Sequence, residues 1–116
     1  MKDFLITTTH QLEGYIITQY LDIVFEESIF GISISTGIKG ISDMFAGWTG
    51  ERLHAISDRI EEVKNEIKEA LINKAVRLGA DALIGVDVET TRNLNDGTIG
   101  VSMSGTAVRV VKAIAK

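Results

Sequence analysis

Residues 51–78 form the longest regular hydrophobic pattern of this 116-residue chain. Apolar side chains recur three or four positions apart, at Leu53, Ile56, Ile60, Val63, Ile67, Ala70, Leu71, Ala75 and Leu78. This spacing places them on one face of an α-helix, and the charged residues between them on the face that contacts water. The pattern stops at Gly79, a residue type that commonly ends helices. The sequence therefore predicts one amphipathic helix over residues 51–78.

This helix is long for the size of the chain. At ~1.5 Å per residue it extends for about 40 Å, whereas a compact domain of this length has a radius of gyration of about 13 Å. We expect one end of the helix to reach past its own domain toward a neighbour. Its charged pairs, such as Glu61 with Lys64 and Glu66 with Lys68, are typical of a solvated face and carry no chemistry.

Two segments before the helix have the composition of β-strands. Residues 4–8 are a short β-branched run that predicts an edge strand, and residues 15–34 predict a long strand or two strands with a bend between them. Strict alternation places one apolar set on one face, namely Ile17, Leu21, Ile23, Phe25 and Ile29. The other face holds Ile16, Tyr20, Val24 and Phe30. Both faces are too apolar to be left in water.

After Gly79 the hydrophobic period changes from helical to two. One face is expected to hold Ala82, Ile84, Val86 and Val88, and the other Asp81, Leu83, Gly85, Asp87 and Glu89. Asp96-Gly97 is a strong hairpin signal, and a last strand follows it. The apolar positions of that strand change parity past Gly105, which predicts a β-bulge there. The expected fold is α+β with the order β-β-α-β-β: an antiparallel-rich sheet covered on one face by one long helix.

The composition excludes several classes of protein. Hydrophobic residues make up 45% and charged residues 24%, as in a soluble globular chain, and we expect a single domain over residues 1–116. Cysteine is absent, which excludes disulfides and thiolate metal sites. The net charge of −4 and the scattered basic residues argue against a nucleic-acid partner. No apolar run approaches a signal-peptide core or the ~20 residues of a membrane span. We expect a cytoplasmic protein with no membrane partner.

Residues 35–50 differ from the strands around them. Apolar side chains recur at helical spacing, at Ile38, Ile41, Met44, Phe45 and Trp48. Four glycines weaken the helix, each costing about 1 kcal/mol relative to alanine. We expect one or two short helical turns with a large apolar side, which makes Ile38–Trp48 the most ligand-like part of the chain.

Motifs for catalysis and phosphate binding are absent from the sequence. Ser35–Gly40 does not match a phosphate-binding loop, and Gly79 and Gly85 do not form a dinucleotide fingerprint. Ser104 lies in no nucleophile elbow. We expect no enzyme and no catalytic residue.

Metal binding has weak support within a single chain. The only imidazoles are His10 and His54, which are not paired, and the methionines are Met1, Met44 and Met103. Carboxylates of Asp81, Asp87 or Glu89 could meet around the axis of a ring, and such oxygen ligands favour Mg²⁺ or Ca²⁺. The simpler interpretation is that alternating acids mark the solvent face of a strand. Metal ligands and cofactor-binding residues therefore stay unassigned.

Two motifs resemble the YbjQ-like family. They are Leu78-Gly79-Ala80-Asp81-Ala82-Leu83-Ile84-Gly85-Val86-Asp87-Val88 and Ser104-Gly105-Thr106-Ala107-Val108. Thr7-Thr8-Thr9, Leu12-Glu13-Gly14-Tyr15 and the glycine-bounded run Gly40–Gly47 are also similar, whereas Trp48-Thr49 stands where the family has a basic residue and serine. The resemblance implies a dodecin-like subunit of a pentameric ring. The family has no assigned activity and is sometimes labelled as heavy-metal-binding.

Assembly is the best-supported expectation, because one helix covers only one face of a sheet. The apolar second face and the Ile38–Trp48 segment would expose a larger patch than monomers tolerate. We therefore expect a homo-oligomer, a pentamer or a pair of pentamers, that acts as a structural or small-ligand-binding module. The alternatives are a ring with metal ligands around its axis, a ring that binds a flat aromatic cofactor through Phe45 and Trp48, and a monomer whose residues 38–48 fold over the open face.

Overall fold

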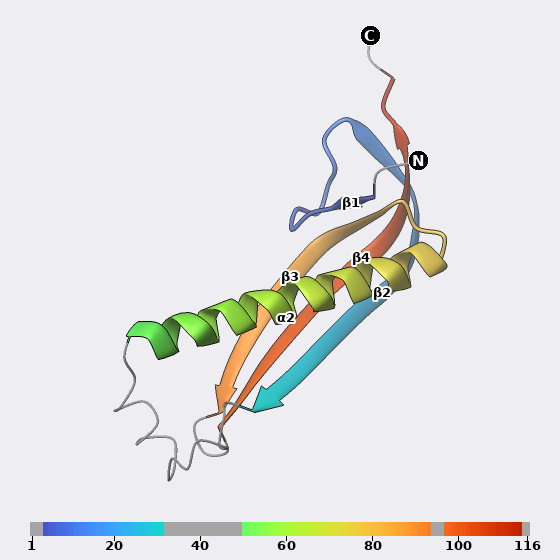
Figure 1. The fold of residues 1–116 in the computed structure, drawn as a ribbon. Coiled ribbons are helices and arrows are strands. Elements are labelled where there is room, and N and C mark those ends of the chain that lie inside the picture. The colour runs from blue at the N-terminus through green and yellow to red at the C-terminus, as the bar shows by residue number, and fades with distance from the viewer. Residues whose placement is uncertain (1–3, 32–49, 94–96, 115–116) are drawn as a thin grey trace.

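A computed structural model of the chain describes residues 4–31, 50–93 and 97–114, with the side chains of α2 described from Ile56 on. The elements in chain order are β1 (Leu5–Ile6), β2 (Tyr15–Gly31), α2 (Gly50–Arg77), β3 (Ala82–Asn93) and β4 (Thr98–Lys112). The strands form one sheet in the order β1-β3-β4-β2, in which β1 is parallel to β3 and the other neighbours are antiparallel. α2 crosses one face of this sheet (Figure 1). The predicted α+β fold and element order are confirmed.

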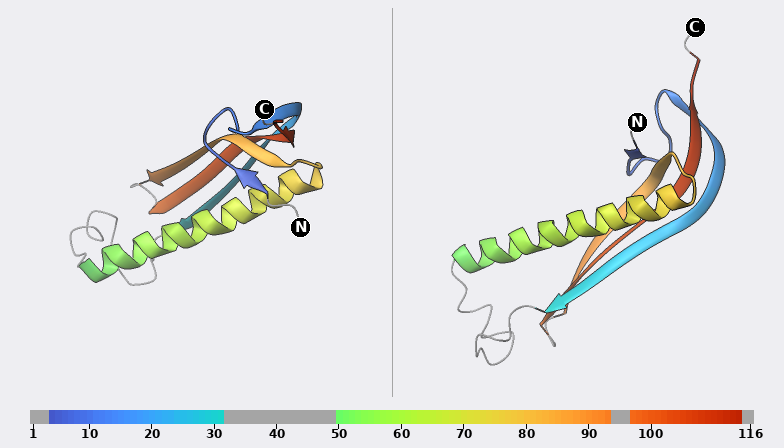
Figure 2. Two further views of the ribbon diagram at one scale, coloured as in Figure 1. Left: turned by 90° about the horizontal axis from the view of Figure 1, so that it is seen from above. Right: turned by 45° about the vertical axis from the view of Figure 1, so that its right-hand side comes forward.

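The long helix lies within one residue of its predicted bounds and buries most of the predicted stripe that is described, whereas Leu78 lies past its end and is 43% exposed. Its buried side chains are 0–7% exposed and lie at Ile60, Val63, Ile67, Leu71 and Ala75. The helix ends where Gly79 adopts a φ of 85°, with Gly79 N–H donating to the Val76 carbonyl (2.9 Å) and Ala80 N–H to the Ala75 carbonyl (3.0 Å). These two bonds satisfy carbonyls that a helix end would otherwise leave without partners. The first turns of α2 extend past the sheet in both views of Figure 2, as the helix length predicts.

Two apolar clusters lie on opposite faces of the sheet. The larger one packs beneath α2 and draws its sheet residues from β2, β3 and β4: Val24, Leu83, Val86, Ile99, Val101, Met103 and Ala107. The smaller one lies at the β1 end of the other face and consists of Ala82, Ile84, Val108 and Val110, with Leu5, Leu12, Tyr15 and Ile17 against it. Among the described residues, the second face of the sheet is therefore buried only at one end.

Strict alternation along β2 was the wrong expectation. Register shifts against β4 leave Thr18 and Leu21 without opposite residues, so the alternation of faces is interrupted between Ile17 and Asp22 and is restored after that. Ile17 consequently packs in the smaller cluster, whereas Leu21 packs beneath α2. Of the predicted set, Ile17, Ile23, Phe25 and Ile29 therefore share the face turned away from α2, and only Leu21 lies on the other.

The predicted faces of β3 were also wrong, and the reason is a bulge at Gly85. Gly85 has a φ of 59°, and the register against β4 shifts between Ile84 and Asp87. Ala82 and Ile84 therefore lie on one face, while Val86 packs beneath α2 on the other. A glycine accommodates this positive φ without the strain that a Cβ would add.

The bulge predicted at Gly105 of β4 lies instead at Gly85 of the neighbouring strand β3. β4 stays in register with β2 through Gly105, and its apolar residues change face because it passes from the larger cluster to the smaller one. A Cβ at Gly105 would lie 3.0 Å from Val86 Cγ2 and 3.3 Å from the Ile84 carbonyl oxygen. Gly105 is therefore the position where the bulge of β3 packs closely against β4.

Gly105→Ala is expected to lower the free energy of unfolding by roughly 1–3 kcal/mol, the range for an overpacked core. The matched control is Gly100→Ala on the same strand, whose added Cβ would lie an ordinary 3.7 Å from Ile29 Cγ1. Urea unfolding at one protein concentration compares the two variants. Equal midpoints would contradict the close packing at Gly105.

Candidate functional site

The face of the sheet turned away from α2, here the open face, carries an exposed apolar row on β2. Ile23, Phe25 and Ile29 are 67–68% exposed. The strand registers place small residues opposite them on β4, at Thr106, Ser104 and Gly100, and Ser102 opposite Glu27. Asp87 and Glu89 follow on β3. A groove of about 420 Å³ lies at the end of this face, lined by Glu27, Ile29, Thr91, Thr98 and Ser102 among others. Outside the smaller cluster, the open face is therefore apolar along β2 and polar along β3 and β4.

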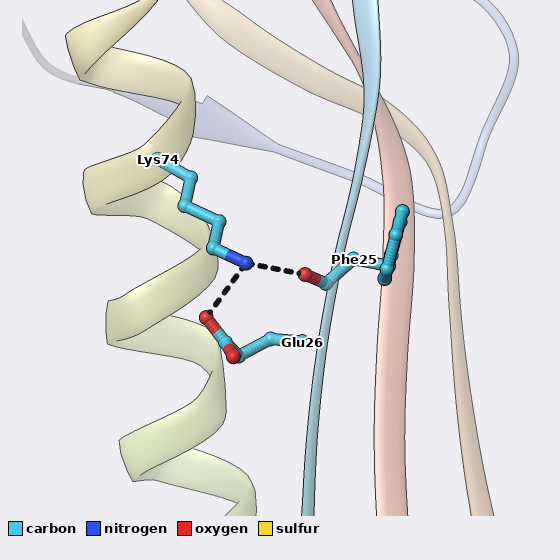
Figure 3. Close-up of polar contacts among 3 residues, drawn as sticks. All are labelled: Phe25, Glu26 and Lys74. Carbon is cyan, nitrogen blue, oxygen red and sulfur yellow. Dashed lines mark hydrogen bonds and ion pairs between the residues drawn. The ribbon is translucent and has the colours of Figure 1, made fainter.

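The outer edge of β2 is sealed over part of its length by side chains. Lys74 Nζ on α2 donates a hydrogen bond to the Phe25 carbonyl (2.9 Å) and lies 3.2 Å from Glu26 Oε2 (Figure 3). Asp22 Oδ1 accepts a hydrogen bond from the backbone N–H of Ile23 (2.8 Å). A charged side chain over the backbone groups of an edge strand prevents other strands from pairing there. The Lys74 seal, formed by Lys74, Phe25 and Glu26, therefore protects one stretch of this edge.

The outer edge of β3 is covered at the same end of the sheet by backbone. β1 pairs with Ala82 and Leu83. Thr7 N–H then donates to the Leu83 carbonyl, Val86 N–H to the Thr7 carbonyl and Gly85 N–H to the Thr9 carbonyl, at 2.8–3.0 Å. Within the described ranges no strand pairs with this edge from Asp87 onward.

The residues considered for metal binding do not come together. Asp81 Oδ2 accepts a hydrogen bond from Val110 N–H (3.0 Å), so this carboxylate joins β3 to β4. Asp87 and Glu89 are exposed on the open face. The described residues contain no group of three or more His, Asp or Glu side chains that could hold a metal.

The other histidine and methionine candidates are also separate. His10 is exposed, and its Nδ1 lies 3.2 Å from where a Cβ of Gly85 would be, so this glycine provides room for the imidazole. Met103 is buried in the core. The side chain of His54, together with Met1 and Met44, lies outside what the structure describes.

The remaining candidates have structural roles or lie outside the described residues. Gly79 ends α2 and Gly85 forms the bulge. Ser104 lies on the open face, half-buried. Ser35–Gly40, the Ile38–Trp48 segment with Phe45, and Trp48-Thr49 belong to the part of the chain that is not described.

Sequence reasoning missed the Lys74 seal. Lys74 lies directly before the buried Ala75 in the helix, so its side chain leaves the border of the apolar stripe. That position is a weak signal, because only the strand order shows that β2 lies at the edge beside it. In the described ranges, no helix combines the length and apolar character that crossing a membrane requires.

Comparison with known proteins agrees with this fold over nearly the whole chain. A family model described as "Putative heavy-metal-binding" (YbjQ-like) matches residues 4–111. A UPF0145 protein from Pseudomonas putida (strain GB-1) is 35% identical, over 91% of this chain and 98% of the relative. One from Halalkalibacterium halodurans is 38% identical, over 90% and 94%.

A solved structure shows the same fold. The crystal structure of a DUF74-family protein of unknown function from Pediococcus pentosaceus superposes with a TM-score of 0.62, covering 93% of this chain and 98% of that one, at 22% identity. The family-model match and the identities of the curated relatives assign the family. This chain belongs to the YbjQ-like (UPF0145) family.

Proposed function

We propose that this chain is a subunit of a homo-oligomeric ring, a pentamer or a pair of pentamers, in the cytoplasm. The ring serves as a structural or small-ligand-binding module and not as an enzyme. One observation carries the proposal: the described sheet has two different outer edges that are each partly uncovered, beside a face with an exposed apolar row. Closed cyclic symmetry satisfies both edges with one repeated contact.

The shape of the chain supports the same proposal. Its radius of gyration is 18.6 Å, against about 13 Å for a compact chain of this length. Its accessible surface is 7993 Å², against about 6,200 Å² for a typical monomer of this mass. Burying apolar surface between subunits stabilises an assembly by roughly 25 cal/mol per Å².

Light scattering coupled to size exclusion tests the ring at micromolar concentration. The expected mass is five or ten times the 12.6 kDa of one chain. A mass equal to one chain would refute the proposal and favour the monomer in which residues 38–48 cover the open face. Dilution to nanomolar concentration provides the control. A closed ring, in which each subunit makes two contacts, is expected to keep its mass on dilution.

Metal binding around the ring axis is the second candidate. Asp87 and Glu89 are exposed side chains of the open face, and the family description favours a metal. A ring would bring copies of these carboxylates together, and oxygen ligands suit Ca²⁺ or Mg²⁺ better than soft metals.

Native mass spectrometry with each metal tests this candidate. A metal retained by the ring and lost in the Asp87→Asn, Glu89→Gln double variant would support it. A ring that retains no metal would refute it. The same spectra give the number of subunits, so failure to bind metal is separated from failure to assemble.

A further inference from the structure

A second groove, here the edge groove, lies along the outer edge of β2 beside the C-terminal end of α2. Its volume is about 350 Å³, which is in the range of small-ligand sites. Its lining comes from four consecutive strand residues, from the last turn of the helix and from the residue after it: Asp22, Ile23, Val24, Phe25, Lys74, Arg77 and Leu78. The edge groove thus places charged side chains of α2 beside the backbone of an edge strand.

The backbone of β2 offers one donor and one acceptor to the edge groove. The Phe25 carbonyl accepts a hydrogen bond from Lys74 outside the sheet, and the Ile23 N–H donates one to the Asp22 carboxylate. Residues two apart in a strand turn their backbone groups the same way, so the Ile23 carbonyl and the Phe25 N–H also face outward. No other strand of the described sheet lies on this side. These two groups are therefore left for a ligand.

The two remaining groups fit one residue in one direction. An antiparallel neighbour needs both backbone groups of the same residue, and at Ile23 and at Phe25 one of the two is already bonded. In parallel pairing, a single residue donates its N–H to one carbonyl and accepts from the N–H two residues further on. The edge groove therefore fits one α-amino acid, with its nitrogen at the Ile23 carbonyl and its carboxylate at the Phe25 N–H.

The charges at the two ends match those of a free amino acid. Asp22 is exposed, and its carboxylate lies at the Ile23 end, where the α-ammonium group would be. Lys74 Nζ lies at the Phe25 end, where the α-carboxylate would be (Figure 3). A lysine ammonium group has three donors, and the Phe25 carbonyl and Glu26 use two of them. The third is available to the ligand.

The strand register directs the side chain of the ligand. A residue paired in parallel beside Val24 places its side chain on the same face as Val24, and Val24 packs beneath α2. On that side the edge groove is lined by Arg77 and Leu78, which are both exposed. Among the residues that the structure describes, none forms a hydrogen bond or ion pair with the Arg77 guanidinium. Guanidinium groups bind carboxylates through paired hydrogen bonds.

We propose that the edge groove binds a free acidic α-amino acid of the glutamate type. Its α-ammonium group lies at Asp22, its α-carboxylate at Lys74 and its side-chain carboxylate at Arg77. The inference rests on the small-ligand part of the proposed function and names the class of that ligand, and it needs no contact between copies. The Lys74 seal becomes part of the site, because it blocks a pairing strand but leaves room for one residue.

Equilibrium dialysis of the full chain against labelled L-glutamate tests the site, and saturable binding is the expected result. Arg77→Gln is expected to weaken L-glutamate binding by about tenfold or more, as loss of a charge-assisted hydrogen bond does. The same variant should bind L-glutamine unchanged, since that side chain carries no charge. Asp22→Asn keeps an acceptor for the Ile23 N–H but removes the charge, so it should weaken the binding of both amino acids. Circular dichroism checks that both variants stay folded.

The matched control is Arg59→Gln, which removes a half-exposed arginine of the same helix that pairs with Glu62 away from the edge groove. It is expected to bind L-glutamate like the unmodified chain. No saturable binding, or equal losses in Arg77→Gln and Arg59→Gln, would overturn the inference.

A blocked competitor separates a free amino acid from a peptide. N-acetyl-L-glutamate amide lacks both terminal charges, so it is expected to displace labelled L-glutamate at least about tenfold less well than unlabelled L-glutamate does. Equal displacement would overturn the inference in favour of an extended peptide. Light scattering of the same samples gives the mass of the assembly. A ring that binds no L-glutamate is thereby distinguished from a chain that does not assemble.

Discussion

Ile67→Asp is expected to leave the chain unfolded at room temperature. Ile67 is 3% exposed and lies in the stripe of α2 that packs on the sheet. Truncating a buried isoleucine costs about 2–5 kcal/mol, and an unpaired carboxylate in the same place adds several more. The sum is comparable to the 5–15 kcal/mol that stabilises a typical domain. Far-UV circular dichroism, with loss of the helical signal, provides the measurement.

The neighbouring position provides the control for this prediction. Lys68 is exposed on α2, so Lys68→Asp places a carboxylate at the next position without burying it. Its expected effect on the free energy of unfolding is under about 1 kcal/mol. A folded, soluble Ile67→Asp variant would show that this face of α2 does not form the core.

Thr90→Pro is expected to break the ring into single chains while the subunit stays folded. By alternation the Thr90 N–H points away from β4, so its own sheet loses no hydrogen bond. A neighbouring strand would lose a donor and meet the proline ring instead. Light scattering should give the mass of one chain, and circular dichroism should keep the wild-type spectrum.

The adjacent residue separates loss of assembly from loss of folding. Thr91 pairs with Gly100 of β4, and its N–H points into the sheet, so Thr91→Pro removes a ladder bond within the subunit. This variant is expected to lose secondary structure or stability. If Thr90→Pro kept the wild-type mass, the outer edge of β3 would not be the contact between copies.

The helix and the element order were predictable because their signals are local. Between Gly50 and Gly79 the apolar residues keep a helical spacing without interruption, which predicts one long helix. After Gly79 the hydrophobic period is two, which predicts strands. The faces of the strands were not predictable, because the bulges at Thr18, Leu21 and Gly85 depend on what each strand pairs with. One extra residue reverses the side on which the following residues lie, until a second one restores it, as in β2.

The candidate surface was predictable only in outline. Excess apolar residues on the second strand correctly indicated a face that α2 does not cover. The two uncovered edges follow from the strand order β1-β3-β4-β2, which no local pattern contains. For Asp81 the sequence suggested a possible metal ligand, but its carboxylate accepts a hydrogen bond from the backbone N–H of Val110.

The Lys74 seal links assembly to the completion of folding. Lys74 belongs to α2, so it reaches the Phe25 carbonyl only after the helix has packed on the sheet. Before that step the outer edge of β2 around Phe25 is free to pair with another strand, and afterwards Lys74 occupies it. A finished subunit is thus selective for its partner, whereas an unfinished one is not. Cells that make this protein would therefore gain from helix docking that is faster than the encounter of two new chains.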